Sequence, residues 1–411
     1  MRRARPFRFH GWNIAWALAI TQTVSFGILF YCFQVFTLPM EAELGLSRAQ
    51  TSGAYSLALL LSGSTAIPVG RWVDRRGARG LMTVASLAGV GLMFAWSFVE
   101  SLAGLYAVQA GIGLVMSAVL YDVAFTVLAV WFRRHRLKAL LIVTLVAGLA
   151  STIFVPLATW LVESWGWRDA LRVLAVIMLF TTVPLHGLVL RDNPRRLGSG
   201  PDGDPLAADR SHEPETSVSV REALRGGAFW WLSTAFTFDR IASVALAAHA
   251  VPLLLERGHS PGLVASVVGT IGAMQLAGRI LFTPAARQAD LTTLTAITFA
   301  VRGAALLLLV FPLSAAGLFV FAAMFGGANG ATTLGRAALV AERFGPANYG
   351  TINGSMSTMI AVVQTVAPLS VGFMRVATGD YKVALIALAG TALVASYSVT
   401  RVRRQTVPAR A

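Results

Sequence analysis

The sequence is poor in charged residues and almost free of cysteine. Only 13% of its 411 residues are Asp, Glu, Lys or Arg, whereas roughly 25% is usual for a soluble protein. Hydrophobic residues make up 56% of the chain. The single cysteine, Cys32, excludes a framework of disulfides within the chain. Together these shortages argue against a soluble domain and against a small secreted one.

Enzyme signatures are also missing. No Cys and His residues stand at metal-ligand spacing, and no P-loop with its lysine is present, so ATP is not the expected energy source. The glycines of Gly111-x-Gly113 lie inside an apolar stretch and indicate helix packing rather than phosphate binding. We therefore predict no enzyme activity, no metal and no cofactor, with a proton or ion gradient as the source of energy.

What the chain does have is long apolar stretches. A membrane-spanning helix needs about 20 mostly apolar residues, and twelve stretches meet this requirement. They are residues 13–38, 51–70, 79–99, 102–132, 136–162, 167–190, 228–255, 261–286, 291–312, 314–341, 349–375 and 380–400. The pattern predicts an all-α membrane protein with twelve transmembrane helices in two six-helix bundles.

Clusters of basic residues separate the first apolar stretches in pairs. The clusters are Arg2–Arg8, Arg71–Arg79, Arg133–Lys138, Arg191–Arg196, Arg221–Arg225 and Arg401–Arg404. Basic loops stay in the cytoplasm, so we predict the cytoplasmic (inner) membrane with both termini inside. The first apolar run is too long for a cleavable signal peptide. The net charge of +15 comes mainly from basic residues in the predicted cytoplasmic loops, where they set the orientation of the chain and attract anionic lipid headgroups. We therefore expect membrane lipids as partners and no nucleic acid. We expect a monomer.

One polar segment divides the spans six and six. Residues 191–226 are rich in Gly, Pro, Asp and Ser, and this composition cannot bury a core of its own. We interpret the segment as a cytoplasmic linker, a flexible tether rather than a regulatory domain, between bundles at residues 1–190 and 227–411. A weak internal repeat supports this division, because an arginine after the second span has a counterpart, Arg287, after the eighth. Duplicated halves are the layout of many secondary transporters.

A short motif follows the second span and reads G-R-W-V-D-R-R-G-A-R over residues 70–79. A glycine lets two helices approach closely, and an aspartate at a helix end or a nearby arginine can pair with helix termini or opposite charges. A plain basic loop would explain the arginines but not the glycine–aspartate spacing. The motif resembles the signature loop of the major facilitator superfamily. The resemblance implies the major facilitator fold and a conformational latch formed by Gly70, Asp74, Arg75, Gly77 and Arg79.

Several further stretches resemble a narrower branch, the bacterial monocarboxylate-transporter-like members with the oxalate/formate exchangers beside them. They are Ser25–Phe30, Leu46–Gln50, Leu120–Phe125, His249–Leu253 and Gln275-x-x-x-Arg279. This likeness implies a small carboxylate substrate bound by Arg279. Mammalian-type members carry an aspartate where Gln275 stands and a lysine in the first span, where this chain has none. Proton coupling through that particular pair is therefore not expected.

Polar groups inside the spans are the candidate site residues. A charged side chain at the centre of a span raises the free energy of membrane insertion by roughly 2.5–3.5 kcal/mol, so its presence there needs a functional or structural reason. Arg279 and Gln275 share a helix face, and a guanidinium suits two-pronged carboxylate binding; the alternative for Arg279 is snorkelling to the interface. His249 either faces the substrate or is a hydrogen-bonded core residue. Tyr121 either donates to a substrate oxygen or packs. Asp122 is the candidate for proton coupling, or it pairs with an arginine.

The sequence assigns no role to Asp239, Arg240, Arg302 or Arg336, although Asp239 and Arg240 could form a local pair or a link between bundles. We predict a secondary transporter that moves small organic anions, chiefly monocarboxylates, by alternating access with proton coupling. The first alternative is a proton-coupled efflux transporter of amphipathic compounds. Members of that class usually carry an arginine where Tyr106 stands and a Gly-Pro-x-x-Gly-Gly run in the fifth span, which this chain lacks. A third alternative is a membrane sensor, for which the short tails leave little room.

Overall fold

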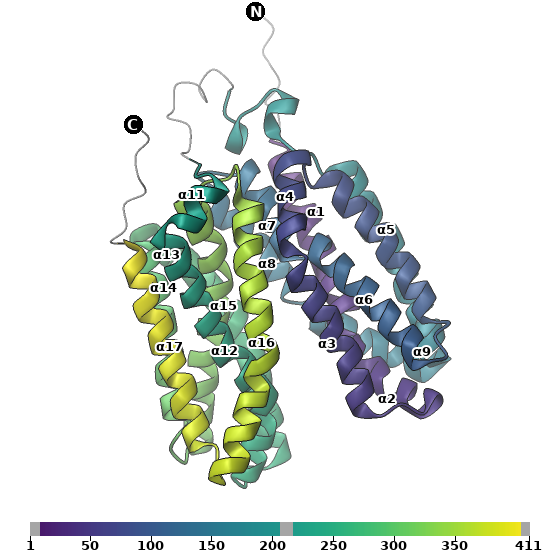
Figure 1. The fold of residues 1–411 in the computed structure, drawn as a ribbon, viewed down its shortest axis with the longest axis vertical. Coiled ribbons are helices and arrows are strands. Elements are labelled where there is room, and N and C mark those ends of the chain that lie inside the picture. Colours follow the sequence, from purple (N-terminus) through teal and green to yellow (C-terminus); the bar gives the residue numbers. More distant parts are fainter. Residues whose placement is uncertain (1–8, 206–216, 404–411) are drawn as a thin grey trace, which may run out of the picture. The chain divides into compact units, whose positions relative to one another are not determined.

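A computed structural model describes residues 9–205 and 217–403 of the chain, and within these ranges the regular elements are helices (Figure 1). The chain divides into two compact units. Unit 1 comprises residues up to Val218 together with Phe344–Ser355, and unit 2 comprises Ser219–Arg343 and the residues from Met356 onward. Each unit is described by itself.

Unit 1 contains the helices of the first half of the chain. They are α1 (Gly11–Ser25), a π-helical turn (Phe26–Tyr31), α2 (Phe33–Leu44), α3 (Arg48–Ser64), α4 (Ala66–Arg76), α5 (Arg79–Trp96), α6 (Leu102–Val119), α7 (Tyr121–Trp131), α8 (Arg136–Ala147), α9 (Ala150–Pro184), a second π-helical turn (Leu185–Val189) and the 3-10 turns Pro194–Leu197 and Pro201–Gly203.

Unit 2 contains longer and less interrupted helices. They are α11 (Val220–Arg225), α12 (Gly227–Glu256), α13 (Pro261–Gln288), α14 (Leu291–Leu308), α15 (Ala315–Phe344), α16 (Tyr349–Thr378) and α17 (Lys382–Arg403). The first turns of α16, up to Ser355, belong to unit 1.

Helix α9 contains a reversal of the chain at Gly166, whose φ of 78° and ψ of 165° are not helical. Contacts made by the residues that follow Gly166 give the direction of the second part of the helix. Arg168 Nη1 donates to the Ser97 carbonyl at the end of α5 (2.7 Å), whereas Arg79 Nε, at the start of α5, donates to the Gly187 carbonyl (2.8 Å). The segment after Gly166 therefore runs antiparallel to α5 and forms a span of its own.

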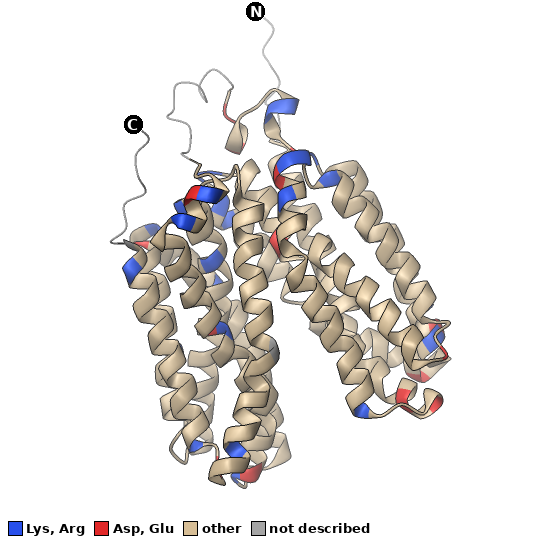
Figure 2. Ribbon diagram, in the orientation of Figure 1, with Lys and Arg blue, Asp and Glu red and all other residues tan. Residues whose placement is uncertain are grey.

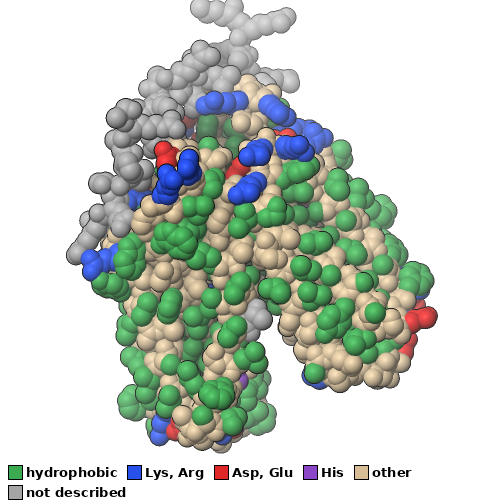
Figure 3. Space-filling view, in the orientation of Figure 1, with side chains coloured by type: hydrophobic (Ala, Val, Ile, Leu, Met, Phe, Trp, Pro, Cys, Tyr) green, Lys and Arg blue, Asp and Glu red, His purple; other side chains and the backbone are tan. Residues whose placement is uncertain are grey.

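Twelve spans follow from these helices. Among the described residues, ten helical stretches are long and apolar enough to cross a membrane, and α3 with α4, bent by 42°, adds an eleventh. The stretch Arg136–Val189 counts as one of the ten although it turns back at Gly166, and dividing it there gives the twelfth. The predicted all-α, twelve-helix fold is confirmed. Large apolar side chains such as Phe180 and Val376 are exposed, as lipid contact requires. Figure 3 shows hydrophobic side chains spread over the visible face.

The basic clusters at residues 71–79, 133–138 and 191–196 lie at one end of unit 1 (Figure 2), whereas the cluster Arg2–Arg8 lies outside the described residues. Asp192 Oδ1 accepts from the Arg79 amide (3.0 Å), which joins the segment after α9 to the start of α5. At the opposite end, Glu43 accepts from Trp167 Nε1 (2.5 Å) and Arg168 Nε (2.9 Å). Alternate loops of this unit therefore gather at opposite ends, which is the arrangement that the spacing of the basic clusters predicts.

The polar segment 191–226 is anchored to unit 1 in its first part. Asp202, whose side chain is only 1% exposed, accepts from the backbone amides of Arg133 (3.1 Å) and Arg134 (2.7 Å) just before α8 begins. An acidic group in this place stabilises the amides at a helix start. Residues 206–216 of the segment lie outside the described residues, and α11 follows with a capping box formed by Ser219 and Glu222. Asp202 thus connects this part of the segment to the start of α8.

The helices α13 and α15 of unit 2 touch through their main chains. A Cβ atom at Gly330 would collide with the Gln275 carbonyl oxygen, and one at Gly278 would collide with the Gly327 carbonyl oxygen. Small residues at such crossings allow close helix packing in membranes. The contact holds the main chain of α13, from which Gln275 and Arg279 extend, against α15.

Candidate functional site

Tyr121 and Asp122 lie at a break in the fourth span. Leu120 has an extended conformation (φ −86°, ψ −168°), so α6 ends at Val119 and α7 begins afresh at Tyr121. Asp122 therefore stands in the first turn of a helix, where a carboxylate is favoured by the helix dipole. Its Oδ1 accepts from Asn353 Nδ2 at 2.9 Å. Asn353 is a partner that the sequence alone did not suggest.

The ring of Tyr121 is packed between two phenylalanines. It stacks on Phe125 with ring centroids 4.8 Å apart and tilts against Phe26 at 4.5 Å. The break also leaves the Val119 carbonyl without a helical partner, and the buried Gln22 donates to it from Nε2 at 2.6 Å. Gln22 is a second polar residue of this region that sequence patterns did not indicate.

Arg279 lies deep in α13 with only 7% of its surface exposed. Snorkelling would carry the guanidinium to the aqueous interface, and this low exposure does not fit that alternative. Gln275 stands one turn earlier and is half-buried, and the glycine contacts with α15 hold the main chain on which both residues sit. The structure thus brings Arg279 and Gln275 together on a rigid part of unit 2.

His249 lies in the second half of α12 and has a hydrogen-bond partner at each ring nitrogen. Its Nε2 lies 3.0 Å from the Pro368 carbonyl oxygen and its Nδ1 lies 3.4 Å from the Tyr381 hydroxyl oxygen. A carbonyl can only accept, so Nε2 is the donor in the bond to Pro368, and the Tyr381 hydroxyl can either donate to Nδ1 or accept from it. In this conformation His249 makes the hydrogen bonds of a core residue, and a substrate would have to replace one of them.

The motif after the second span closes around the start of α16, within unit 1. A Cβ at Gly70 would collide with the Gly350 carbonyl oxygen, so only glycine permits this approach. Asp74 accepts three hydrogen bonds, from the Gly350 amide (2.9 Å), the Thr351 amide (2.7 Å) and the Thr351 hydroxyl (2.6 Å). The carboxylate therefore caps the exposed amides of the first turn of α16.

The rest of the motif ties α4 to α5 and to the segment after α9. Gly77 ends α4 with a φ of 87°, which a side chain would disfavour. The next residues bring the Arg79 amide to Asp192, which also forms an ion pair with Arg196 at 3.6 Å. Arg75 is exposed beside Asp74. Of the predicted latch residues, Gly70 and Asp74 contact α16, whereas Gly77 and Arg79 organise the turn.

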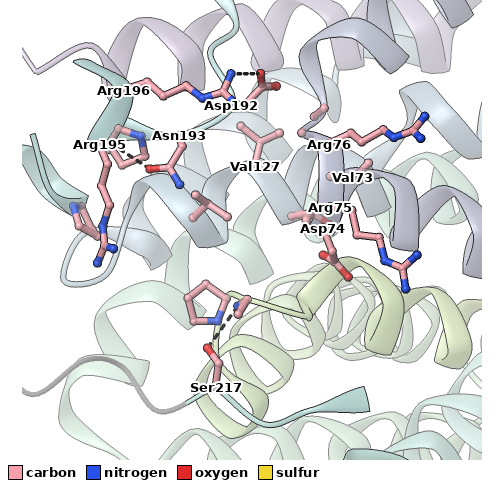
Figure 4. Close-up of a pocket in the computed structure, with 18 of the residues that line it drawn as sticks. Val73, Asp74, Arg75, Arg76, Val127, Asp192, Asn193, Arg195, Arg196 and Ser217 are labelled. Atoms are coloured by element: carbon pink, nitrogen blue, oxygen red, sulfur yellow. Dashed lines mark hydrogen bonds and ion pairs between the residues drawn. The ribbon is translucent and has the colours of Figure 1, made fainter. Parts of the chain in front are cut away.

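A cavity of about 480 Å³ opens beside this motif in unit 1 (Figure 4). Charged residues of both signs surround it, with valines such as Val73 and Val127 in its wall. Figure 4 shows Arg196 turned toward Asp192 on one side and Arg75 and Arg76 directed away from the cavity on the other. The cavity is therefore the space left between the motif and the segment after α9, and the arginines drawn around it do not converge on one point.

The strongest polar cluster of unit 2 is one that the sequence did not predict. Asp239 and Arg302 form a buried ion pair, with side chains 5% and 0% exposed. Arg302 also donates to the Asp239 carbonyl (3.1 Å) and to Ser243 Oγ (2.7 Å) through Nη1, and to Asn329 Oδ1 and Thr332 Oγ1 (both 3.3 Å) through Nη2. The cluster joins α12, α14 and α15.

The local pair proposed from the sequence between Asp239 and Arg240 is not what the structure shows. Asp239 turns to Arg302, while Arg240 is exposed on another face of α12 and donates from Nε to Gln364 Oε1 on α16 (3.2 Å). Arg336 is half-buried on α15 and donates to Ser357 Oγ. Within the described residues no group of His, Cys, Asp and Glu side chains could hold a metal ion.

Comparison with known proteins places these features in a family context. A model of the Major Facilitator Superfamily matches residues 18–368. Monocarboxylate transporter 13 of Bos taurus is 27% identical over 413 residues, which cover 95% of this chain and 88% of that protein. The oxalate:formate antiporter of Oxalobacter formigenes is 27% identical over 249 residues, covering 59% of this chain and 54% of that protein.

Solved structures share the fold at lower identity. The fucose:proton symporter of E. coli superimposes with a TM-score of 0.72 at 16% identity, covering 97% of this chain and all of that one (100%). The human organic anion transporter MFSD10 gives a TM-score of 0.72 at 13% identity, and the superposition covers 96% of this chain and 100% of the MFSD10 chain. Both likenesses concern the fold alone.

Proposed function

Because the chain belongs to the Major Facilitator Superfamily, we propose that it is a secondary active transporter of small organic anions, with carboxylates as the substrate class. It is a multi-pass membrane protein and not an enzyme. We place it in the cytoplasmic membrane with both termini inside, following the basic clusters. Transport proceeds by alternating access of one site to the two sides of the membrane.

Arg279 is the observation that carries this proposal. A guanidinium inside a span is costly to place there, and its planar fork matches a carboxylate in two-pronged geometry. Gln275 adds an amide one turn away, and the close contact of α13 with α15 holds the main chain from which both side chains extend. Within unit 2, His249 is the further proposed ligand, with a ring nitrogen to offer a substrate oxygen. In unit 1, Tyr121 is proposed as a substrate ligand on its own account, through its hydroxyl.

Asp122 is the group that we propose takes up and releases the coupling proton. Two aspartates lie inside the spans, and one of them, Asp239, is held by Arg302 in a buried ion pair. Asp122 Oδ1 accepts from the amide of Asn353 (2.9 Å), and either the carboxylate or the carboxylic acid can accept that bond. This hydrogen bond can therefore persist in both states of a proton-carrying group.

A ligand test separates this function from drug efflux. Purified protein should unfold at a higher temperature with millimolar L-lactate or butyrate than with sodium chloride of equal ionic strength, because a ligand that binds only the folded state stabilises it. Tetraphenylphosphonium, a lipophilic cation, should have no such effect. Stabilisation by the cation and by none of the carboxylates would favour the efflux alternative instead.

The latch is the second element of the mechanism. Asp74 caps the first turn of α16, and α16 continues from that turn into unit 2. We propose that these hydrogen bonds hold one conformation and break during transport. Asp74→Asn removes the charge and one acceptor while keeping the side-chain shape, so the turnover rate should change severalfold while ligand affinity stays within about twofold. Counterflow rates and calorimetry on the same preparation measure the two quantities.

Arg76→Gln is the matched control for this substitution. Arg76 belongs to the same loop but stacks on Trp72, 4.4 Å from the ring centroid, and takes no part in the cap. It should leave both turnover and affinity near wild type. Loss of ligand binding in a well-folded Asp74→Asn protein would contradict the latch and place Asp74 in the binding site.

A further inference from the structure

His249 has only one N–H when its ring is neutral, and the contacts of the ring show where that N–H lies. A neutral imidazole donates from one nitrogen and accepts at the other. Nε2 lies 3.0 Å from the Pro368 carbonyl oxygen, which can only accept. The neutral ring therefore keeps its proton on Nε2, and Nδ1 accepts from the Tyr381 hydroxyl at 3.4 Å. Neutral His249 thus has no second N–H to offer.

The two partners of the ring differ in how readily a substrate replaces them. Pro368 contributes a main-chain carbonyl inside α16 at a usual hydrogen-bond length, whereas Tyr381 contributes a side-chain hydroxyl at 3.4 Å, beyond the usual range of about 2.7–3.2 Å. Gly372, one turn after Pro368, leaves the edge of the half-buried ring open: a Cβ atom there would lie 3.7 Å from Cε1, the carbon between the two nitrogens. Nδ1 is therefore the position that a substrate reaches.

A carboxylate cannot use this position while the ring is neutral. An ionised carboxylate accepts hydrogen bonds and donates none, so it would face the lone pair of an acceptor nitrogen. Protonation of Nδ1 removes this conflict, because an imidazolium donates from both nitrogens and carries a positive charge. The bond from Nε2 to the Pro368 carbonyl is retained in that state. The ring therefore binds a carboxylate through Nδ1 only after it has taken up a proton.

The charged groups around this ring are paired with one another rather than with the ring. Ionisable residues between the ring and the neighbouring helix ends are Glu256, Arg257, Arg375, Asp380, Tyr381 and Lys382. Arg375 pairs with Glu256 at 2.9 Å, and Lys382 pairs with Asp380 at 3.8 Å. Within the described residues the hydrogen-bond partners of the imidazole are Pro368 and Tyr381, and neither is a carboxylate. A protonated ring here thus favours a bound anion as its counter-ion.

We propose that a carboxylate substrate binds His249 through Nδ1 of the protonated ring and displaces the Tyr381 hydroxyl, which occupies this position when no substrate is bound. The proton comes from the aqueous medium and returns to it when the substrate leaves. The inference rests on the proposed function, in which His249 is a ligand, and it adds the protonation state in which the ring binds. This proton is separate from the one proposed at Asp122 in unit 1.

Proton counting by calorimetry tests the inference on the purified full-length protein. Binding heats of L-lactate in two buffers of different ionisation enthalpy, phosphate and Tris, give the number of protons taken up per bound lactate. Lactate itself stays ionised between pH 7 and 8. Wild-type protein should take up about one proton more per lactate than His249→Gln protein. Because the bound state holds the extra proton, this contribution should weaken lactate binding by up to about tenfold as the pH rises from 7 to 8.

Three further variants accompany this measurement. Tyr381→Phe removes only the hydroxyl that competes for Nδ1, so it should bind lactate at least as tightly as wild type and keep the proton uptake. His259→Gln, in the loop after α12, should behave as wild type. Asp122→Asn should keep the proton that belongs to His249. A glutamine at position 249 retains an N–H for the Pro368 carbonyl, and the thermal unfolding midpoint shows whether each variant is folded.

Several outcomes would overturn the inference. Equal proton uptake in wild-type and His249→Gln protein, with lactate bound by both, would show that His249 takes up no proton with the substrate. Lactate binding that is weakened as much by Tyr381→Phe as by His249→Gln would show that the hydroxyl is a required partner rather than a replaceable one. If wild-type protein binds no lactate, the proposed function fails as well, and this result is distinct from lactate binding without the additional proton.

Discussion

Replacing Arg279 with alanine should weaken carboxylate binding by well over tenfold. Removing one member of a buried charged pair costs about 2–5 kcal/mol of binding, because the partner charge is left desolvated without compensation. Arg279 is 7% exposed and stands on a helix whose main chain is held by α15, which restricts any collapse of the site around the missing side chain. Calorimetric titration of L-lactate into wild-type and variant protein measures the loss.

Arg279→Lys distinguishes anion binding from a structural charge. An ammonium group cannot reproduce the planar fork, so lysine should restore only part of the affinity. A purely structural arginine predicts a different pattern, in which lysine substitutes fully and alanine alters folding more than affinity. Unchanged lactate affinity in a well-folded Arg279→Ala protein would remove Arg279 from the site.

Arg302→Met should strongly destabilise the folded protein. It leaves the Asp239 carboxylate buried without its counter-ion and deprives Ser243 and Asn329 of a donor. Breaking a buried pair by removing one partner typically costs about 3–5 kcal/mol of folding free energy. Thermal unfolding in detergent should therefore show a large drop in the midpoint, whereas the double variant Asp239→Asn with Arg302→Met should recover part of the loss.

A matched control is the exposed pair between Arg375 and Glu256 in the same unit. Their side chains are 31% and 44% exposed and lie 2.9 Å apart. Surface ion pairs contribute about 0–1 kcal/mol, so Arg375→Ala should change the unfolding midpoint little. Equal midpoints for Arg302→Met and Arg375→Ala would mean that the buried cluster is not a principal support of unit 2.

The sequence predicts the membrane fold well because span length and hydropathy are local properties. A span of about 20 apolar residues is recognisable without knowledge of its neighbours, and α13 begins at Pro261, where the predicted eighth span begins. The motif at residues 70–79 is likewise recognisable from its own spacing. Its partner, the first turn of α16, is not, because Thr351 follows Asp74 by 277 positions.

The polar cluster of unit 2 shows why adjacency in sequence misleads inside helices. Successive residues of an α-helix point about 100° apart, so Asp239 and Arg240 face different surroundings although they are neighbours. Asp239 meets Arg302, 63 residues further along the chain, and Arg240 meets Gln364, 124 residues away. The hydropathy pattern of the sequence shows that such residues lie inside a span. It does not show which neighbouring helix their side chains contact.

Counterflow of radiolabelled L-lactate into proteoliposomes tests the central claim most directly, since it requires neither the direction of transport nor the coupling ion. Vesicles that hold the protein and are loaded with unlabelled lactate should take up label transiently above its equilibrium level. Vesicles with Arg279→Ala protein, or with no protein, should not. Uptake by wild-type vesicles that matches protein-free vesicles, with folded protein present, would contradict the assignment of this chain as a carboxylate transporter.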